Sequence, residues 1–229
     1  MPASTVLNYE GTAMLILAHR GRHDSAPENT LAAFRRAVAA GVDGIETDLR
    51  LDANGELVLF HDRFAPDGRA VESLTREELS RAAGYPVPSL TEALGDGADV
   101  LWNLEIKVRE ATEPTINLLR QLAGRRRVLV TSFLHPVVVE IVSKLDVEGG
   151  LLVAHDPIDG LPLRQWHPRL RSIVFDCATA APGTIRRATE AGFDVYLYNT
   201  TTAEDHRRAR ACGVHGLITD HLDLVLQNA

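Results

Sequence analysis

Residues 17–34 read LAHRGRHDSAPENTLAAF, and the character of the chain changes twice within this stretch. An apolar run ends abruptly at His19-Arg20-Gly21, a polar loop follows, and a helical pattern begins near Asn29. Asn29 is a suitable N-cap for a helix over residues 30–40, whose apolar side chains recur on one face. The stretch is therefore typical of a strand, a loop and a helix in succession.

The same alternation recurs along the chain. Short apolar runs predict nine strands, at residues 14–19, 44–51, 57–61, 101–108, 128–133, 150–155, 172–176, 194–198 and 216–219. Helical patterns lie between most of them, at residues 73–83, 91–94, 112–123, 136–144, 183–191 and 203–211. Such alternation indicates an α/β protein with a parallel sheet covered on both faces. Because the chain has no dinucleotide-binding fingerprint, we favour a closed (β/α)8 barrel over a doubly wound sheet.

A (β/α)8 barrel has eight strands, so one of the nine candidates is surplus. Residues 49–62, LRLDANGELVLFHD, connect two of the candidates by about five residues. A parallel crossover needs a dozen residues or more. The region therefore either makes a hairpin-like excursion or contains a segment that is not a barrel strand, and the sequence leaves both open.

Length and composition favour one domain over residues 1–229, since the 229 residues show no linker or low-complexity tract. The net charge of -7 argues against a nucleic-acid-binding surface. The run Arg125-Arg126-Arg127 is interpreted as solvated charge at a helix end.

The cellular setting is predicted to be the cytoplasm. Cys177 and Cys212 have no metal-ligand spacing and are expected to be buried thiols in a reducing compartment. Residues 1–13, MPASTVLNYEGTA, lack the basic and apolar segments of a signal peptide. The longest apolar runs have the length of strands, so we expect no stable membrane insertion.

Two strands carry charged residues on one face. In residues 44–51, GIETDLRL, Glu46 and Asp48 alternate with apolar residues, and in residues 103–108, NLEIKV, Glu105 and Lys107 do the same. An isolated segment of this kind would fit an antiparallel sheet with one face exposed to solvent. In a parallel barrel the apolar face meets the helices, so these charges would point inward.

Converging carboxylates inside a barrel need a partner, because a lone buried carboxylate is costly. Glu46, Asp48 and Glu105 would suit one hard divalent cation, Mg²⁺ or Ca²⁺ with Mn²⁺ as a further candidate, since oxygen-only ligands disfavour zinc. Lys107 could instead balance the charge in a structural ion network. Both readings remain open at this point.

Two histidines favour catalysis. His61 ends an apolar strand just as His19 does, and residues at the carboxyl ends of barrel strands form active sites in this fold. The pair fits acid-base catalysis. Arg20 offers a planar fork suited to a phosphate, and with Lys107 and a divalent cation the set suits phosphoester cleavage.

The motifs resemble those of a known family, the glycerophosphodiester phosphodiesterases, over nearly the whole chain. They occur in the family's order: His19-Arg20-Gly21 as HRG, 27–30 as PENT, 46–48 as E-x-D, His61-Asp62 as HD, 87–90 as I-P-T-L, 103–107 as N-I-E-I-K, Ser132-Phe133 as SF, and 216–220 as G-I-I-T-D. The resemblance implies a TIM-type barrel of the phospholipase-C-like phosphodiesterase type. It also implies hydrolysis of a small-molecule glycerophosphodiester to glycerol 3-phosphate and an alcohol.

The resemblance assigns roles by position. Glu46, Asp48 and Glu105 would ligate the cation, His19 and His61 would be the acid and the base, and Arg20 and Lys107 would hold the phosphate. The oligomeric state, the alcohol released, and which histidine is the acid stay undetermined.

The chain departs from the family pattern in two places. Residues 196–199, YLYN, replace Trp-Thr-Val-Asn, so Tyr196 is either a wall of the substrate pocket or plain core packing. Residues 63–68 replace the family's Arg-Thr-Thr, and the short stretch from His61 to Asn103 leaves room for little or no inserted cap domain, which predicts an open pocket. His23-Asp24 is expected to be a solvated loop pair, with substrate contact as the alternative.

Three other functions stay open. The same residues fit an enzyme that cleaves lysophospholipid or sphingolipid head groups and forms a cyclic phosphate. A non-catalytic phosphodiester-binding barrel would be expected to lack a histidine or a carboxylate, and none is missing here. A metal-dependent carbon-carbon lyase would not need the second histidine at a strand end. The remaining histidines are expected to be structural or on the surface: His135, His155, His167, His206, His215 and His221.

Overall fold

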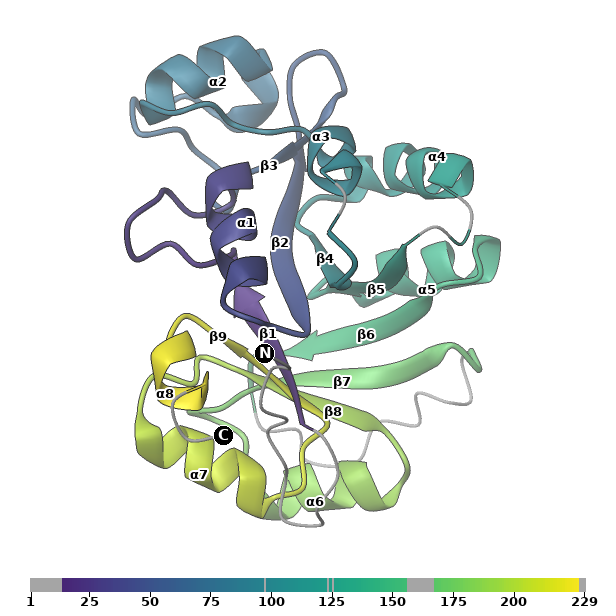
Figure 1. Cartoon of the computed structure of the whole chain (residues 1–229). Coiled ribbons are helices and arrows are strands. Elements are labelled where there is room, and N and C mark those ends of the chain that lie inside the picture. The colour runs from purple at the N-terminus through teal and green to yellow at the C-terminus, as the bar shows by residue number, and fades with distance from the viewer. Residues whose placement is uncertain (1–13, 97, 123, 125, 156–166, 227–229) are drawn as a thin grey trace.

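The computed structural model describes residues 14–96, 98–122, 124, 126–155 and 167–226. In this part of the chain eight parallel strands form a closed barrel in the order β1-β9-β8-β7-β6-β5-β4-β2, and β2 pairs back to β1 (Figure 1). The barrel strands are β1 (Leu15–His19), β2 (Gly44–Leu51), β4 (Leu101–Ile106), β5 (Arg127–Ser132), β6 (Glu148–Val153), β7 (Leu170–Asp176), β8 (Asp194–Tyr198) and β9 (Gly216–Thr219). The predicted (β/α)8 barrel is confirmed.

Helices follow most of the strands and agree with the predicted ranges to within about two residues, apart from α2 (Arg76–Ala83), which begins three residues after its predicted start. They are α1 (Leu31–Ala39), α3 (Leu90–Gly95), α4 (Thr112–Leu122) after the short turn η2 (Arg109–Ala111), α5 (His135–Lys144), α6 (Pro182–Glu190), α7 (Ala203–Ala211) and the unpredicted α8 (Leu222–Leu226). No helix of the described residues is long and apolar enough to cross a membrane. Predictions that concern residues 1–13, Ala123 and Arg125 lie outside the described residues.

The surplus ninth strand is a hairpin partner of β2. The strand β3 (Leu57–Leu59) runs antiparallel to β2, with Leu57 opposite Leu51 and Leu59 opposite Leu49. The short connection allows this arrangement, because antiparallel strands can be joined by a tight turn. Of the two alternatives left open by the sequence, the hairpin-like excursion is the one observed.

The hairpin belongs to a small insertion between β2 and α3, which lies beside the barrel (Figure 1). It continues through η1 (Val71–Ser73) and α2 (Arg76–Ala83), where Thr75 and Glu78 form a capping box. The insertion has a hydrophobic core of its own, made by Val58, Phe60, Ala65, Val71, Leu74, Leu79 and Val87. The insertion is small, as expected, but it is an independently packed unit rather than a bare loop.

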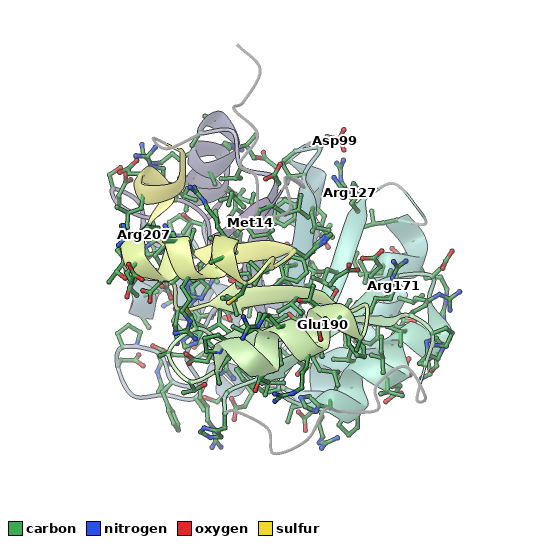
Figure 2. The ribbon with its side chains drawn as sticks, turned by 90° about the horizontal axis from the view of Figure 1, so that it is seen from below. Met14, Asp99, Arg127, Arg171, Glu190 and Arg207 are labelled. Atoms are coloured by element: carbon green, nitrogen blue, oxygen red, sulfur yellow. The ribbon has the colours of Figure 1, made fainter. Side chains whose placement is uncertain are left out.

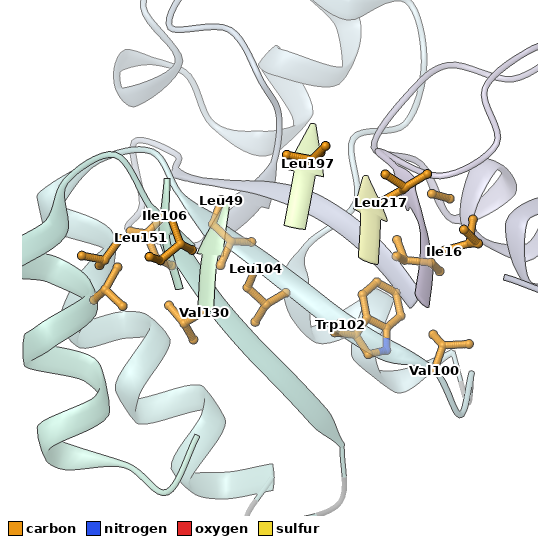
Figure 3. Packing of buried hydrophobic residues seen from close by; sticks show 14 of the residues in the cluster. Ile16, Leu49, Val100, Trp102, Leu104, Ile106, Val130, Leu151, Leu197 and Leu217 are labelled. Carbon is orange, nitrogen blue, oxygen red and sulfur yellow. The ribbon is translucent and has the colours of Figure 1, made fainter. Parts of the chain in front are cut away.

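The strands separate two apolar layers because alternate side chains point to opposite faces. The outer layer packs between the strands and the helices, and includes Ile16, Leu49, Trp102, Leu104 and Leu197 (Figure 3). The inner layer fills the barrel with Leu17, Leu101, Leu129, Leu152, Val174, Tyr196 and Ile218. The next inward positions along β1, β2 and β4 are polar, so the interior changes from apolar to charged toward the carboxyl ends of the strands.

At the opposite end of the barrel, where the strands begin, the described residues form no such charged interior layer. Figure 2 shows the charged side chains of Asp99, Arg127 and Arg171 near the starts of β4, β5 and β7. Beneath them the inner layer is apolar. The cluster of buried polar residues thus lies at the end of the barrel predicted from the fold.

One predicted cap is wrong. Thr30, not Asn29, is the N-cap of α1, since the Thr30 hydroxyl accepts a hydrogen bond from the Ala33 N–H at 3.2 Å. Asn29 instead has a left-handed backbone with φ of 55° and is buried. Its side chain points toward β2, where it contacts Asp48.

The turn after β1 depends on Gly21. Its φ is +82°, and a Cβ there would lie 2.8 Å from the main-chain carbon of Ala33 in α1. Gly55, in the hairpin turn, has a similar φ of +78° but nothing within 4 Å of the corresponding position. A side chain at Gly55 would therefore meet only the unfavourable backbone angle, whereas a side chain at Gly21 would also clash with α1.

We expect Gly21→Ala to destabilise the protein more than Gly55→Ala. Gly55→Ala should cost about 1–2 kcal/mol of unfolding free energy, because only the left-handed backbone opposes the methyl group. Gly21→Ala should cost a further 1–3 kcal/mol or so, because the methyl group also overpacks α1. Urea denaturation of both variants measures the difference, and equal losses would contradict the close approach of this turn to α1.

Candidate active site

A cavity of about 230 Å³ opens at the carboxyl ends of the barrel strands. One part of its lining is charged and comes from β1, β2, β4 and the hairpin: His19, Arg20, Glu46, His61, Glu105 and Lys107. Another part is largely apolar and comes from β5, β6, β8 and β9: Phe133, Leu152, Tyr198 and Ile218. All the predicted site residues except Asp48 and Tyr196 therefore line one cavity.

The barrel register brings the carboxylates together. Asp48 on β2 lies beside Glu105 on β4, and Glu46 lies beside His19 on β1. One carboxylate oxygen from each of Glu46, Asp48 and Glu105 lies within 4.8 Å of the others. Glu46 and Asp48 are buried, so the three form an acidic cluster at the floor of the cavity.

The three carboxyl groups of the acidic cluster differ in their charge balance. Burial raises the pKa of Glu46 well above its usual value, and repulsion from Asp48 and Glu105 raises it further. Burial also opposes ionisation of Asp48, but the cations of Lys107 and Arg20 outweigh it and lower the Asp48 pKa. The pKa of Glu105 is raised by burial, although Lys107 acts against the shift.

Two cations reach the acidic cluster from one side. Lys107 Nζ lies 2.7 Å from Glu105 Oε1 and 3.3 Å from Asp48 Oδ1. Arg20 Nε lies 3.1 Å from Asp48 Oδ2, while its Nη1 donates to both oxygens of Glu28 at 3.0 Å. Both side chains are mostly buried, so their positions are fixed before any ligand arrives.

The acidic cluster fits a divalent cation. Lys107 pairs with Asp48 and Glu105, but two carboxylate oxygens are buried without a hydrogen-bond partner: Asp48 Oδ1, which still lies 3.3 Å from Lys107 Nζ, and Glu46 Oε1. A buried carboxylate oxygen left without a donor is costly, and the donor set contains only oxygens. Of the two readings left open by the sequence, the Lys107 network is observed, and the acidic cluster with its unpaired oxygens is compatible with the metal site as well.

His19 is held from the far side of its ring. Its Nδ1 lies 2.8 Å from Asp220 Oδ1, and its Nε2 lies 3.8 Å from Glu46 Oε2. His23 Nε2 lies 2.9 Å from the same Asp220 oxygen. Burial opposes ionisation of Asp220, but the hydrogen bonds with His19 and His23 outweigh it and hold the Asp220 pKa below its usual range. His23 is thus bound to a site residue rather than being a solvated partner of Asp24.

His61 reaches the cavity by a different route from the one predicted. It does not end a barrel strand. The preceding strand β3 runs antiparallel to β2, so it carries the chain from the carboxyl end of β2 back toward the start of that strand. Phe60 N donates to the Asp48 carbonyl at 3.1 Å, and Arg50 Nε donates to the His61 carbonyl at 2.9 Å. His61 Nδ1 lies 2.8 Å from Asp62 Oδ1. The hairpin therefore returns His61 to the level of Asp48.

Unusual backbone angles gather at the site. Among the described residues, those with positive φ other than glycine are Arg20, Asn29 and Asn199. Arg20 and Asn199 line the cavity. Asn29 Nδ2 donates to Asp48 Oδ2 at 2.9 Å, and Asn29 Oδ1 accepts from Thr47 Oγ1 at 2.6 Å. Such angles are uncommon outside glycine, and here each one aims a polar side chain at the site or supports one.

The structure places Tyr196 away from the cavity and brings to the site three residues that the sequence analysis did not single out: Tyr198, Asn103 and Asp220. Tyr196 is 3% exposed and belongs to the inner apolar layer, so its placement supports the core-packing alternative and not a pocket wall. Tyr198, the next inward position on β8, lines the cavity instead, and strand alternation could have indicated it. Asn103 also lines the cavity, with its Nδ2 buried and unpaired. Asp220 was within a quoted motif, but nothing local in the sequence pairs it with His19.

Comparisons with known proteins agree on one family. The family model described as the glycerophosphoryl diester phosphodiesterase family matches residues 19–224. A glycerophosphodiester phosphodiesterase of Caldanaerobacter subterraneus subsp. tengcongensis is 30% identical over 233 residues, covering 90% of this chain and 93% of the relative. A glycerophosphodiester phosphodiesterase of Bacillus altitudinis is 28% identical over 239 residues, covering 91% and 95%.

Solved structures support the fold. A glycerophosphodiester phosphodiesterase from Thermotoga maritima aligns with a TM-score of 0.81 at 23% identity, covering 95% of this chain and 99% of that one. A phosphodiesterase from Oleispira antarctica, in complex with the product sn-glycerol-3-phosphate, aligns with a TM-score of 0.81 at 22% identity, covering 93% and 95%. At these identities the likeness is one of fold.

The charge balance predicts opposite effects for two isosteric variants in EDTA. Glu46→Gln should raise the melting temperature by about 2–6 °C at neutral pH, since it removes the cost of keeping a buried carboxyl group protonated above its usual pKa. Asp48→Asn should lower the free energy of unfolding by about 3 kcal/mol, since it removes the buried carboxylate that Lys107 and Arg20 share and leaves each of them with one partner instead of two. Thermal unfolding by circular dichroism measures both, and a fall for Glu46→Gln would contradict the imbalance.

The advantage of Glu46→Gln should depend on pH. Because the folded-state pKa of Glu46 is raised, the metal-free protein keeps the proton that the unfolded chain releases near pH 4.5. Its stability therefore falls as the pH rises above that value, whereas the glutamine variant has no such loss. The difference in melting temperature should be smallest near pH 4 and grow toward neutral pH.

Proposed function

The chain belongs to the glycerophosphoryl diester phosphodiesterase family, and from that premise we propose that it hydrolyses glycerophosphodiesters to glycerol 3-phosphate and an alcohol. In this proposal a divalent cation and the pair His19 and His61 carry the reaction. The observation that supports it best is that one cavity is lined by both histidines and by Lys107, with the acidic cluster at its floor.

Glu46, Asp48 and Glu105 would hold the cation, which we propose to be Mg²⁺ or Ca²⁺, with Mn²⁺ as a further candidate. When bound, it would offset the negative charge that builds up on the phosphoryl oxygens during attack. The orphaned Glu46 Oε1 supports this assignment, because a cation would supply the partner that it lacks.

Arg20 and Lys107 would bind the non-bridging phosphoryl oxygens. Both line the cavity, and both are already held by carboxylates: Arg20 by Glu28 and Asp48, and Lys107 by Glu105 and Asp48. Cations held in place before binding lose little freedom when the phosphate arrives, so they stabilise developing charge efficiently. The unpaired Asn103 Nδ2 would add a neutral donor on the same floor.

His19 and His61 would handle the protons. One of them removes a proton from the attacking water as its oxygen bonds to phosphorus. The other gives a proton to the alcohol oxygen as its bond to phosphorus breaks. Both rings line the cavity, and each is oriented through Nδ1 by an aspartate, Asp220 for His19 and Asp62 for His61. The Nε2 atom of each ring would then be available to exchange a proton with the water or the substrate.

The apolar part of the lining would receive an organic substituent of the phosphate. Phe133 and Tyr198 pack edge to face with ring centroids 6.2 Å apart, and Phe133 is 45% exposed. The cavity thus has a charged part for the phosphate and an apolar part for carbon. The Oleispira antarctica phosphodiesterase holds sn-glycerol-3-phosphate, which is consistent with a glycerol substituent here.

A second reaction path shares every group named above. A lysophospholipid or sphingolipid substrate could place its own hydroxyl where water would attack, which would give a cyclic phosphate. Hydrolysis in ¹⁸O-labelled water separates the paths, since direct attack by water puts the label into the phosphate product without a cyclic intermediate. A cyclic species, even transient, would favour the second path.

We also propose that residues 1–229 form one domain and that the protein works in the cytoplasm on small-molecule substrates. The barrel strands run from Leu15 to Thr219, which supports a single unit. Cys177 and Cys212 are both free and buried, which agrees with a reducing compartment.

We expect release of glycerol 3-phosphate from glycerophosphocholine or glycerophosphoethanolamine, abolished by EDTA and restored by Mg²⁺, Ca²⁺ or Mn²⁺. An enzyme-coupled assay for glycerol 3-phosphate measures this and ranks the cations and the head groups together. A folded protein that releases none with any cation would overturn the proposal.

His19→Ala and His61→Ala should each lower kcat by roughly 10²–10⁴-fold, which is the usual contribution of acid-base catalysis. Both should still bind the cation, because neither ring is among the carboxylate ligands. Isothermal titration with Mn²⁺ provides the binding control. His206→Ala is the matched variant, since His206 is buried beside Thr219 and does not line the cavity. Near-normal turnover of either His19→Ala or His61→Ala would contradict its role.

A further inference from the structure

Asp220 Oδ1 is shared by two imidazole rings. His19 Nδ1 lies 2.8 Å from it and His23 Nε2 lies 2.9 Å from it. His19 ends β1, Asp220 follows β9, and His23 lies in the loop between β1 and α1. Three segments of the chain therefore converge on one carboxylate oxygen beside the cavity.

We propose that His23 is a positioning residue that acts through Asp220 to hold His19 in its reactive tautomer and orientation. The proposal rests on the role of His19 proposed above. His23 itself is not among the residues that line the cavity, and its contact with the site is with Asp220. Its effect on the reaction has to pass through the carboxylate that it shares with His19.

The tautomer follows from the hydrogen bonds. An ionised carboxylate only accepts, so each ring nitrogen that bonds to Asp220 must carry a proton. This fixes neutral His19 with its proton on Nδ1, which leaves Nε2 free on the side of Glu46, 3.8 Å from Oε2. A neutral histidine without such a partner would populate both tautomers, and one of them has its lone pair turned away from the cavity.

The second ring fixes the carboxylate itself. The Asp220 side chain is 39% exposed, and no hydrogen bond of the described residues reaches its other oxygen, so a single bond to His19 would leave it free to rotate. His23 approaches from the β1–α1 loop and supplies a second donor. That loop is itself tied down, since Arg22 N donates to the Ala33 carbonyl at 2.9 Å and Arg22 Nη2 to Asp223 Oδ1 at 3.2 Å.

A fixed carboxylate gives a fixed imidazole, and small displacements of a catalytic group cost rate. We therefore expect His23→Ala to lower kcat about 10-fold with little change in KM, because the substrate contacts are unchanged. Asp220→Ala should cost about 10²-fold or more, since it removes the tautomer constraint as well. His23→Gln, which keeps an N–H donor at a similar reach, should recover most of the kcat lost in His23→Ala.

A double-mutant cycle tests whether His23 acts through Asp220. If it does, His23→Ala costs nothing further in the Asp220→Ala background, and the two losses are strongly non-additive. Additive losses, a change confined to KM, or an unaltered kcat in His23→Ala would overturn the proposal. His215→Ala is the matched control, because His215 lies 3.5 Å from Asp194 at the other end of the barrel and should leave kcat unchanged.

The ¹⁵N NMR shifts of the His19 ring supply a readout that needs no turnover. At a pH where the ring is neutral, the wild-type protein should show a protonated Nδ1 and an unprotonated Nε2. Asp220→Ala should show a mixture of tautomers, and His23→Ala a smaller change in the same direction. Wild-type tautomer shifts in both variants would overturn the proposal even if the enzyme cleaved none of the diesters tried, so this result is separate from failure of the proposed reaction.

Discussion

The mutual repulsion of three carboxylates, held side by side inside a barrel, is the constraint on which the site depends. The register places Asp48 beside Glu105 and puts Glu46 two residues earlier on the same strand, so the charges cannot separate without unpairing β2 from β4. Lys107, Arg20 and Asn29 all converge on Asp48, and Lys107 also pairs with Glu105. Glu46 Oε1 is left without a donor. This imbalance is the feature that supports the cation site proposed above.

The barrel tolerates this imbalance because its stability comes mainly from elsewhere. The extensive outer layer packs the strands against the helices, and the inner layer closes the barrel beneath the site. Each layer removes apolar surface from water independently of what lies at the carboxyl ends of the strands. The charged end can therefore keep an unfavourable arrangement in the absence of a ligand, at a cost that the rest of the fold offsets.

Patterns that are local in sequence predicted a large part of this architecture. Strand alternation placed Glu46, Asp48 and Glu105 inside the barrel, and helix periodicity gave most helix bounds to within about two residues. The predictions that were wrong concern residues whose positions depend on partners distant in sequence. Asn29 has the composition of an N-cap, but its side chain is taken by Asp48, 19 residues away. His61 looks like the end of a barrel strand, and only the pairing of β3 with β2 shows how it reaches the site. Tyr196 and Tyr198 both point inward, and the depth of each in the barrel decides which one meets the cavity.

The origins of the site groups suggest why the parts of the site differ in rigidity. The carboxylates come from the barrel strands, whose register fixes them. The two histidines differ: His19 is the last residue of β1 and pairs in register with Glu46, whereas His61 is brought to the site by the hairpin connection. Connections hold side chains less firmly than paired strands do. Each ring has an aspartate at Nδ1, and Arg50 ties the His61 carbonyl to the end of β2. Hydrogen bonds with side chains thus help to orient the two histidine rings, as the barrel register orients the carboxylates.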